Sequence, residues 1–248
     1  MGDLRTVAGK RLDGLVDGAF AFGITILIVG TGDATISYDG LIATFAQVPA
    51  FSLSLLIILS FWWAHRQFSL MTLHNDWIND ALSIIVMFVI LIYVFPVSFL
   101  TRALTHWLSD AALPGTGLLP FQIRSVYEIF GGGFALLSGI YAVMYARSAY
   151  PDEDDTIGHG PYVPARFKPA AKRASYLWAI WAVAAILSIL TAVLGGLNWL
   201  IWLPLVPYAL AMIAALGWLI WTPSKPPPPL DEEDMIEWQR KLRAAQAD

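Results

Sequence analysis

Residues 15–30, LVDGAFAFGITILIVG, form an apolar run with a single acid, Asp17, near its start and two basic residues, Lys10 and Arg11, just before it. Five more apolar runs of similar length follow along the chain. Hydrophobic residues make up 57 % of the 248 positions, the mean hydropathy is +0.61, and only 14 % of the residues are charged. Soluble domains carry about 25 % charged residues. The sequence therefore predicts an integral membrane protein.

The apolar runs predict six membrane-spanning helices, because a helical span needs about 20 residues. Their Leu, Ile and Ala content and the lack of a two-residue alternation favour helices over barrel strands. The first run has no cleavage-site pattern, so we expect it to be retained as a span. We predict an all-α membrane domain over residues 1–221 and a Pro-rich spacer with a short cytoplasmic helix over residues 222–248. The predicted spans are residues 14–31, 41–64, 78–101, 125–145, 174–194 and 197–221.

The distribution of Lys and Arg predicts the orientation of the chain. With six spans, both termini lie on one side of the membrane. Arg102 and Arg124 are the only basic residues predicted on the other side, and the remaining 13 of the 15 lie in the termini and in the loops after the second and fourth spans. Cytoplasmic loops are enriched in Lys and Arg. Both termini are therefore expected to face the cytoplasm.

Polar side chains within the spans are costly and are usually functional. Arg11 and Asp17 are six residues apart, so they are not neighbours on one helix, and we expect partners for them from other spans. His65 and Asn79 lie at a similar depth, at the cytoplasmic ends of the second and third spans. We interpret Arg11, Asp17, His65 and Asn79 as an interhelical polar lock. A proton relay through His65 and Asp17 is the alternative.

Arg124 and Glu128, spaced i,i+4, are expected to form a local ion pair at the outer end of the fourth span.

The first span also has a stripe of apolar and small side chains along one face of the predicted helix. At 100° per residue, one stripe contains Leu15, Gly18, Phe22, Thr25, Ile26 and Val29. Asp17 lies about 140° from Phe22, on the side expected to pack into the protein. Several copies of this span around one axis would build a dry constriction with a ring of Thr25 hydroxyls, which can gate ions by dewetting. Packing of the stripe on a neighbouring helix is the alternative.

The sequence resembles the TMEM175 family of potassium channels in motifs between residues 11 and 96. The family opens its first helix with Arg-x-x-x-Phe-Ser-Asp, where this chain has RLDGLVD at residues 11–17. A Trp…His segment ends the second span, here FWWAHR at residues 61–66, and Trp-x-Asn opens the third, here WIN at residues 77–79. Pro96, late in the third span, also fits the pattern.

The resemblance implies a homotetramer with four first helices around a central pore, in the membrane of a bacterial cell and without a TVGYG filter. It implies that the narrowest ring lies five residues after the motif Asp, at Phe22, that Thr25 contributes to selectivity, and that Ile26 and Val29 line the next turns. Potassium, and other monovalent cations with it, is the expected permeant ion. The chain departs from the family at Leu15 and Val16, which replace Phe and Ser, and at Phe22, which replaces an aliphatic residue.

Other function classes have less support in the sequence. A proton-conducting channel or a secondary transporter using Asp17 and His65 is the main alternative. The glycines at 131–133 are interpreted either as a hinge or as a site of close helix packing.

We expect no enzyme activity, cofactor, metal site or nucleic-acid partner, because the chain has no Cys, no nucleophile–base pair and no phosphate-binding loop. Tryptophans near the span ends, Trp62 and Trp178 among them, are interpreted as membrane-interface anchors.

Overall fold

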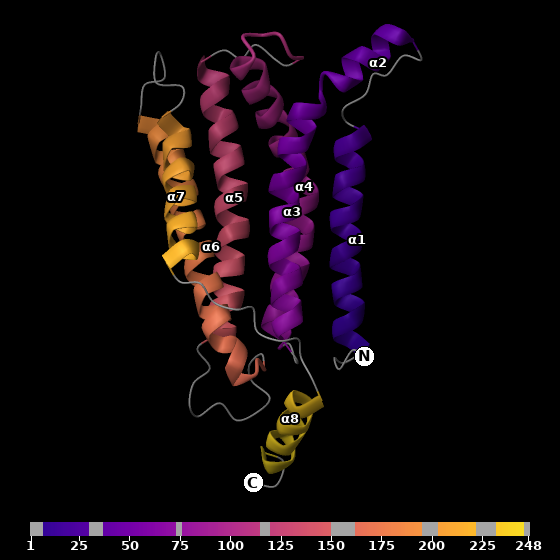
Figure 1. The fold of residues 1–248 in the computed structure, drawn as a ribbon, viewed down its shortest axis with the longest axis vertical. Coiled ribbons are helices and arrows are strands. Elements are labelled where there is room, and N and C mark those ends of the chain that lie inside the picture. The colour runs from indigo at the N-terminus through magenta and orange to yellow at the C-terminus, as the bar shows by residue number, and fades with distance from the viewer. Residues whose placement is uncertain are drawn as a thin grey trace.

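The computed structural model describes residues 7–29, 37–72, 76–114, 120–149, 162–194, 203–221 and 232–245. Within them the secondary structure is almost entirely helical, and the long helices run side by side in one bundle (Figure 1). The helices are α1 (Val7–Val29), α2 (Tyr38–Phe45), α3 (Val48–Met71), α4 (Trp77–Leu108), α5 (Pro120–Ala149), α6 (Lys168–Leu194), α7 (Val206–Trp221) and α8 (Glu232–Ala245), with short 3-10 turns at Ala165–Phe167 and Leu203–Leu205.

Five helices, α1, α3, α4, α5 and α6, are long and apolar enough to cross a membrane. The all-helical membrane fold predicted from the sequence is therefore confirmed, and the protein is a multi-pass membrane protein. The sixth predicted span is represented by α7, whose 16 residues extend only about 24 Å against a hydrocarbon core of about 30 Å. The first residues of that predicted span, 197–202, lie outside the described residues.

The predicted second span is wrong at its beginning, because the chain forms two helices there instead of one. The short helix α2 is capped by Ser37, whose hydroxyl accepts a hydrogen bond from the Gly40 N–H at 3.0 Å. The helix α3 then begins at Val48 with Pro49 in its first turn, where a missing N–H costs nothing. No residue of α2 is buried, and the helix projects from the bundle at the end opposite to α8 (Figure 1).

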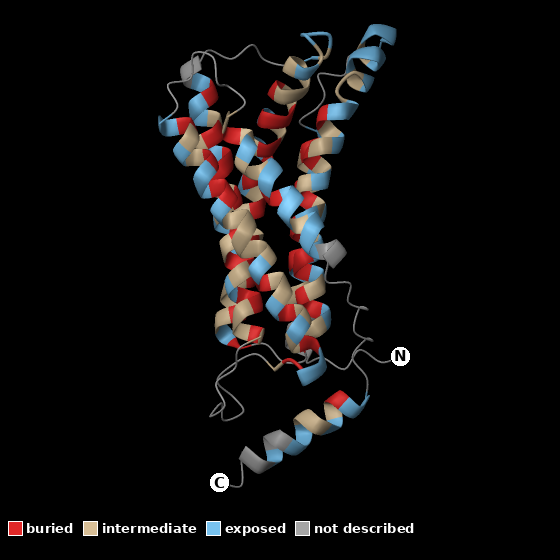
Figure 2. Ribbon diagram, turned by 60° about the vertical axis from the view of Figure 1, so that its left-hand side comes forward, coloured by how far each residue is buried: buried red, intermediate tan, exposed pale blue. Residues whose placement is uncertain are grey.

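Aromatic side chains fill the core between α3, α4, α5 and α6. The Phe61 ring on α3 lies at the centre, with ring centroids of Phe134 at 5.2 Å, Trp178 at 5.5 Å, Tyr141 at 6.2 Å and Tyr93 at 6.3 Å. Buried residues lie where the helices face one another (Figure 2). Trp178 stacks on this core and is only partly buried, so its interpretation as a membrane-interface anchor stays a prediction.

Two buried tyrosine hydroxyls in the bundle are paired with backbone carbonyls of other helices. The Tyr145 hydroxyl donates to the Ala64 carbonyl at 2.7 Å, and the Tyr93 hydroxyl donates to the Phe130 carbonyl at 2.8 Å. Both hydrogen bonds join different helices, the first α5 to α3 and the second α4 to α5. They fix the relative positions of the helices against which α1 packs.

Two ion pairs lie at the end of the bundle where α1 begins and α8 lies. Asp76 caps α4 by accepting the Asn79 N–H at 3.1 Å, and it also binds Arg147 Nη2 on α5 at 2.5 Å. Arg166, just before α6, binds Asp234 on α8. Because α8 opens with acids and has Arg243 in its last turn, its charges also suit the helix dipole. The separation of residues 222–248 as a unit of their own stays a prediction.

Candidate functional site

One face of α1 is packed into the bundle. Val16, Phe20 and Leu27 are at most 2 % exposed, and they repeat at a helical period on the side that meets α3 and α4. Gly23 lies on the same side, and a Cβ added there would come within 3.2 Å of Val94 Cγ2 on α4. This close approach fixes the rotation of α1 about its own axis.

The opposite face of α1 is uncovered by the described part of the chain. The exposed fractions are 54 % for Leu15, 59 % for Phe22 and 71 % for Val29, and Gly18 and Thr25 are exposed as well. We call these five residues the α1 ridge. It contains Phe22, Thr25 and Val29 of the predicted pore lining. In a membrane, an apolar ridge of this kind is covered either by lipid or by other copies of α1.

Two residues of the predicted stripe, Ile26 and Thr25, have contacts within the subunit. Ile26 is only half-exposed and turns toward α4, where it lines a groove with Leu27 and Val94. The Thr25 hydroxyl donates to the Ala21 carbonyl at 3.0 Å. The donor of this hydroxyl is therefore used within the helix, while its oxygen can still accept a hydrogen bond or face a cation.

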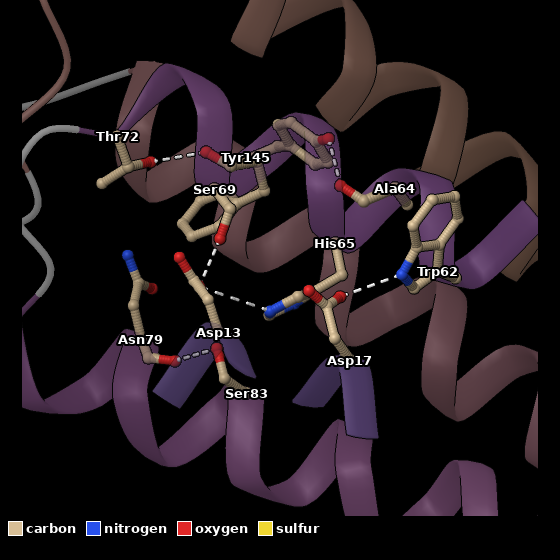
Figure 3. A network of polar contacts seen from close by, with 11 residues as sticks. Asp13, Asp17, Trp62, Ala64, His65, Ser69, Thr72, Asn79, Ser83 and Tyr145 are labelled. Atoms are coloured by element: carbon tan, nitrogen blue, oxygen red, sulfur yellow. Dashed lines mark hydrogen bonds and ion pairs between the residues drawn. The ribbon is translucent and has the colours of Figure 1, made fainter. Parts of the chain in front are cut away.

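A cluster of polar residues joins the first half of α1 to α3 (Figure 3). Asp17 accepts a hydrogen bond from Trp62 Nε1 at 2.9 Å. Asp17 itself is exposed, whereas the helical stripe predicts it on the packed side, and its partner is neither His65 nor Asn79 as expected. Trp62, interpreted above as a membrane anchor, is therefore part of the contact between α1 and α3. The Arg66 guanidinium lies 5.5 Å from the centroid of the Trp62 ring.

The acid that approaches His65 is Asp13, which the sequence analysis missed. Its carboxylate accepts from the Ser69 hydroxyl at 2.5 Å and lies 3.9 Å from His65 Nε2, and His65 is 2 % exposed. The spacing in the sequence contains the missing signal. Asp13 precedes Asp17 by four residues and so shares its face, and Trp62, His65 and Ser69 are spaced i, i+3 and i+7 along one face of α3.

The other two residues of the predicted lock lie differently. Asn79 is fully buried in the first turn of α4, where its N–H donates to Asp76 and its carbonyl accepts from Ser83 at 2.9 Å. Its side-chain amide has no hydrogen-bond partner among the described residues. Arg11 is exposed on α1 and is absent from the contacts drawn in Figure 3. The lock thus stays a prediction for Arg11 and Asn79, while Asp17 and His65 lie at the contact between α1 and α3.

The pairing of Asp17 with Trp62 can be tested by a double-mutant cycle. The cycle combines Asp17→Ala with Trp62→Phe, which keeps a ring and removes the donor. We expect a coupling of about 0.6–1.7 kcal/mol in the free energy of unfolding in detergent, the range for hydrogen bonds between membrane helices. The matched cycle of Asp17→Ala with His65→Phe should give a smaller coupling. Equal couplings in the two cycles would contradict the pairing.

Outside this cluster the titratable side chains suggest little further chemistry. Arg124 Nε binds Glu128 Oε1 at 2.7 Å, which confirms the predicted i,i+4 ion pair. No group of three or more His, Asp or Glu residues that could hold a metal ion occurs in the described ranges.

Comparison with known proteins places the sequence similarity in the part of the chain that contains α1, α2, α3 and most of α4. The family model described as the endosomal/lysosomal potassium channel TMEM175 matches residues 11–96. A protein of Marivirga tractuosa named as a potassium channel is 32 % identical over 96 residues, which is 39 % of this chain and 38 % of that protein. The matched region thus spans less than two fifths of the curated relative. The predicted resemblance to the TMEM175 family is confirmed for this region.

The fold agrees with solved channel structures over most of the chain. The crystal structure of a variant of the potassium channel MtTMEM175, in complex with a nanobody–MBP fusion, superposes with a TM-score of 0.66 at 17 % identity, over 85 % of this chain and 90 % of that one. The structure of a lysosomal potassium-selective channel TMEM175 homolog from Chamaesiphon minutus gives 0.56 at 17 % identity, over 86 % and 98 %. At this identity the likeness establishes the fold.

Proposed function

We propose that this chain is the subunit of a homotetrameric, potassium-favouring cation channel in which four copies of α1 surround the pore. The observation that carries the proposal is the α1 ridge, an apolar face of α1 that the described part of the chain leaves uncovered. The segment that matches the family model begins within this helix. If four subunits assemble around one axis, their α1 ridges would face one another, be shielded from lipid, and line a path for ions along that axis. The neighbouring proteins named as potassium channels support the choice of ion.

Phe22 would form the narrowest ring and Thr25 the next one. The two residues are about 4.5 Å apart along the helix, and Val29 lies about 10 Å from Phe22. Four phenyl rings would make a dry constriction, and the four Thr25 oxygens would face an ion that has lost part of its water shell. Selectivity would then come from partial dehydration at a narrow ring rather than from a cage of backbone carbonyls. Permeation would be passive.

The polar cluster would anchor each α1 while its ridge faces the pore. The hydrogen bonds from Asp17 to Trp62 and from Asp13 to Ser69 hold the first half of α1 against α3. The outer half is held by apolar packing of Leu27 and by the close approach of Gly23 to α4. This arrangement would hold α1 by polar contacts at the end that we assign to the cytoplasm and by apolar packing at the level of Phe22 and above.

Ion flux in liposomes tests the proposal. Purified protein is expected to pass potassium down its gradient in preference to sodium, and native mass spectrometry should give four subunits. Equal flux of the two ions would contradict the potassium preference, and a monomer or dimer that still carries flux would contradict the shared pore. Empty liposomes and liposomes with heat-denatured protein are the controls.

The proton-relay alternative has less support, because Asp17 bonds to Trp62 and not to His65. Asp13 is the acid near His65, at 3.9 Å, and it lies near the beginning of the Arg11–Val29 span rather than near its middle, where carriers bind their ions. A flux assay with a pH gradient and no potassium gradient separates the two hypotheses. A proton flux that exceeds the potassium flux and is abolished by His65→Gln would favour the relay.

A further inference from the structure

A groove lies between the outer halves of α1 and α4, at the end of the bundle opposite to α8. Its volume is about 200 Å³, and its lining consists of Ile26, Leu27, Val94, Phe95, Ser98, Phe99 and Arg102. This is smaller than the roughly 300–1,000 Å³ of pockets that enclose a drug-sized ligand. The groove therefore suits one end of a longer molecule that continues outside it.

The groove is arranged along the membrane normal. Phe95, Ser98, Phe99 and Arg102 are spaced i, i+3, i+4 and i+7, so they share one face of α4. Arg102 lies about 10 Å along the helix from Phe95 and about 5 Å from Phe99. Phe95 is 63 % exposed and Phe99 is 39 % exposed, so the groove opens to the outside of the subunit. Its apolar part faces toward the membrane centre, and its single guanidinium lies at the outer end.

Arg102 lies at headgroup depth if the polar cluster marks the other membrane surface. Asn79 and Arg102 are about 35 Å apart along α4, which is slightly more than the roughly 30 Å hydrocarbon core. A guanidinium at this level binds phosphate with paired N–H donors. Arg102 also has an interaction within the chain, but its five donors allow a second partner.

We propose that this groove is a binding site for an anionic phospholipid, with the phosphate on Arg102 and one acyl chain along Phe99 and Phe95. Apolar contacts give little net affinity in a bilayer, because lipid tails are as apolar as the groove. The preference must therefore come from charge, and the lipid that fits is acidic rather than zwitterionic. The site lies behind the α1 ridge, and its existence does not depend on whether the chain conducts ions.

Native mass spectrometry of the full chain, titrated with phosphatidylglycerol or phosphatidylcholine of the same acyl chains, tests the site. We expect phosphatidylglycerol to bind about fivefold more tightly, the effect of one basic residue near a lipid surface. Arg102→Gln should remove this preference. Arg124→Gln is the matched control, because Arg124 is the other cation predicted on that side and is paired with Glu128, and it should leave the preference intact.

A second variant separates the groove from the charge. Ser98→Phe fills the groove and keeps Arg102, so it should weaken retention of both lipids at this site. The inference is overturned if the preference survives Arg102→Gln, if Ser98→Phe leaves the binding of both lipids and the number of subunits unchanged, or if Arg124→Gln removes the preference equally. Inorganic phosphate or oleate that displaces phosphatidylglycerol at equal concentration would assign the site to a free anion or a fatty acid instead. A loss of subunits in Ser98→Phe with unchanged lipid binding would show that a second copy covers the groove.

Discussion

Replacing Phe22 with alanine is expected to raise the potassium flux of the reconstituted protein about tenfold or more. The expectation follows from the place of Phe22 on the α1 ridge, where its side chain is 59 % exposed and has no cover from the described chain. Four phenyl rings at one level would exclude water, and removing them would widen and wet the constriction. A tenfold rise needs a barrier lower by only about 1.4 kcal/mol, a modest demand for the removal of four rings.

The matched control is Phe88→Ala, because Phe88 is exposed to a similar extent, 60 %, and belongs to α4 rather than to the α1 ridge. This control should leave the flux unchanged. Phe22→Ile introduces the aliphatic type of residue that the family resemblance implies at this position, and it should give a flux between those of the unchanged protein and Phe22→Ala. Equal flux in the Phe22→Ala and unchanged proteins, at equal amounts of tetramer, would remove Phe22 as the constriction.

The α1 ridge could be predicted from the sequence because it depends on helical periodicity alone. Once residues 15–30 are a helix, the 100° step places Phe22, Thr25 and Val29 together, and Gly23 falls on the other side. The structure differs from this pattern at Ile26, which turns toward α4 because it borders both faces, and at Asp17, which is exposed. Helical periodicity does not predict what covers the α1 ridge, because this depends on contacts between chains and not on the period of one helix.

The pairing within the polar cluster could not be predicted in the same way. It depends on the axial register and rotation of α1 against α3, which the close approach of Gly23 to Val94 helps to set. A shift of four residues, about one helical turn, would bring Asp13 opposite Trp62 in place of Asp17. The break between α2 and α3 was missed for another reason. Only Ala46 and Gln47 separate the two helices, and apolar residues on both sides make the stretch resemble one continuous span, which hides the helix start that Pro49 marks.

Substitution of the glycines at 131–133 on α5 is expected to change the stability of the protein. The effect is expected at Gly133, and Gly132 provides the control. A Cβ on Gly133 would come within 2.3 Å of the Tyr93 ring on α4, whereas a Cβ on Gly132 would meet nothing within 4 Å. Gly133→Ala must therefore push away a ring whose hydroxyl is bonded to the Phe130 carbonyl at 2.8 Å. We expect it to lower the free energy of unfolding by about 1–3 kcal/mol.

The melting temperature in detergent measures this effect, and Gly133→Ala should lower it by roughly 2–12 °C. Gly132→Ala should raise it slightly, since alanine favours a helix over glycine by about 1 kcal/mol. These outcomes would favour close packing of α5 over a hinge as the reason for the glycines. A hinge predicts the reverse pattern, in which either substitution stiffens α5 and slows ion flux while the melting temperature stays the same or rises. Because the two variants differ by one position in one helix, general effects of added helix propensity cancel, and the difference between them reports the contact with Tyr93.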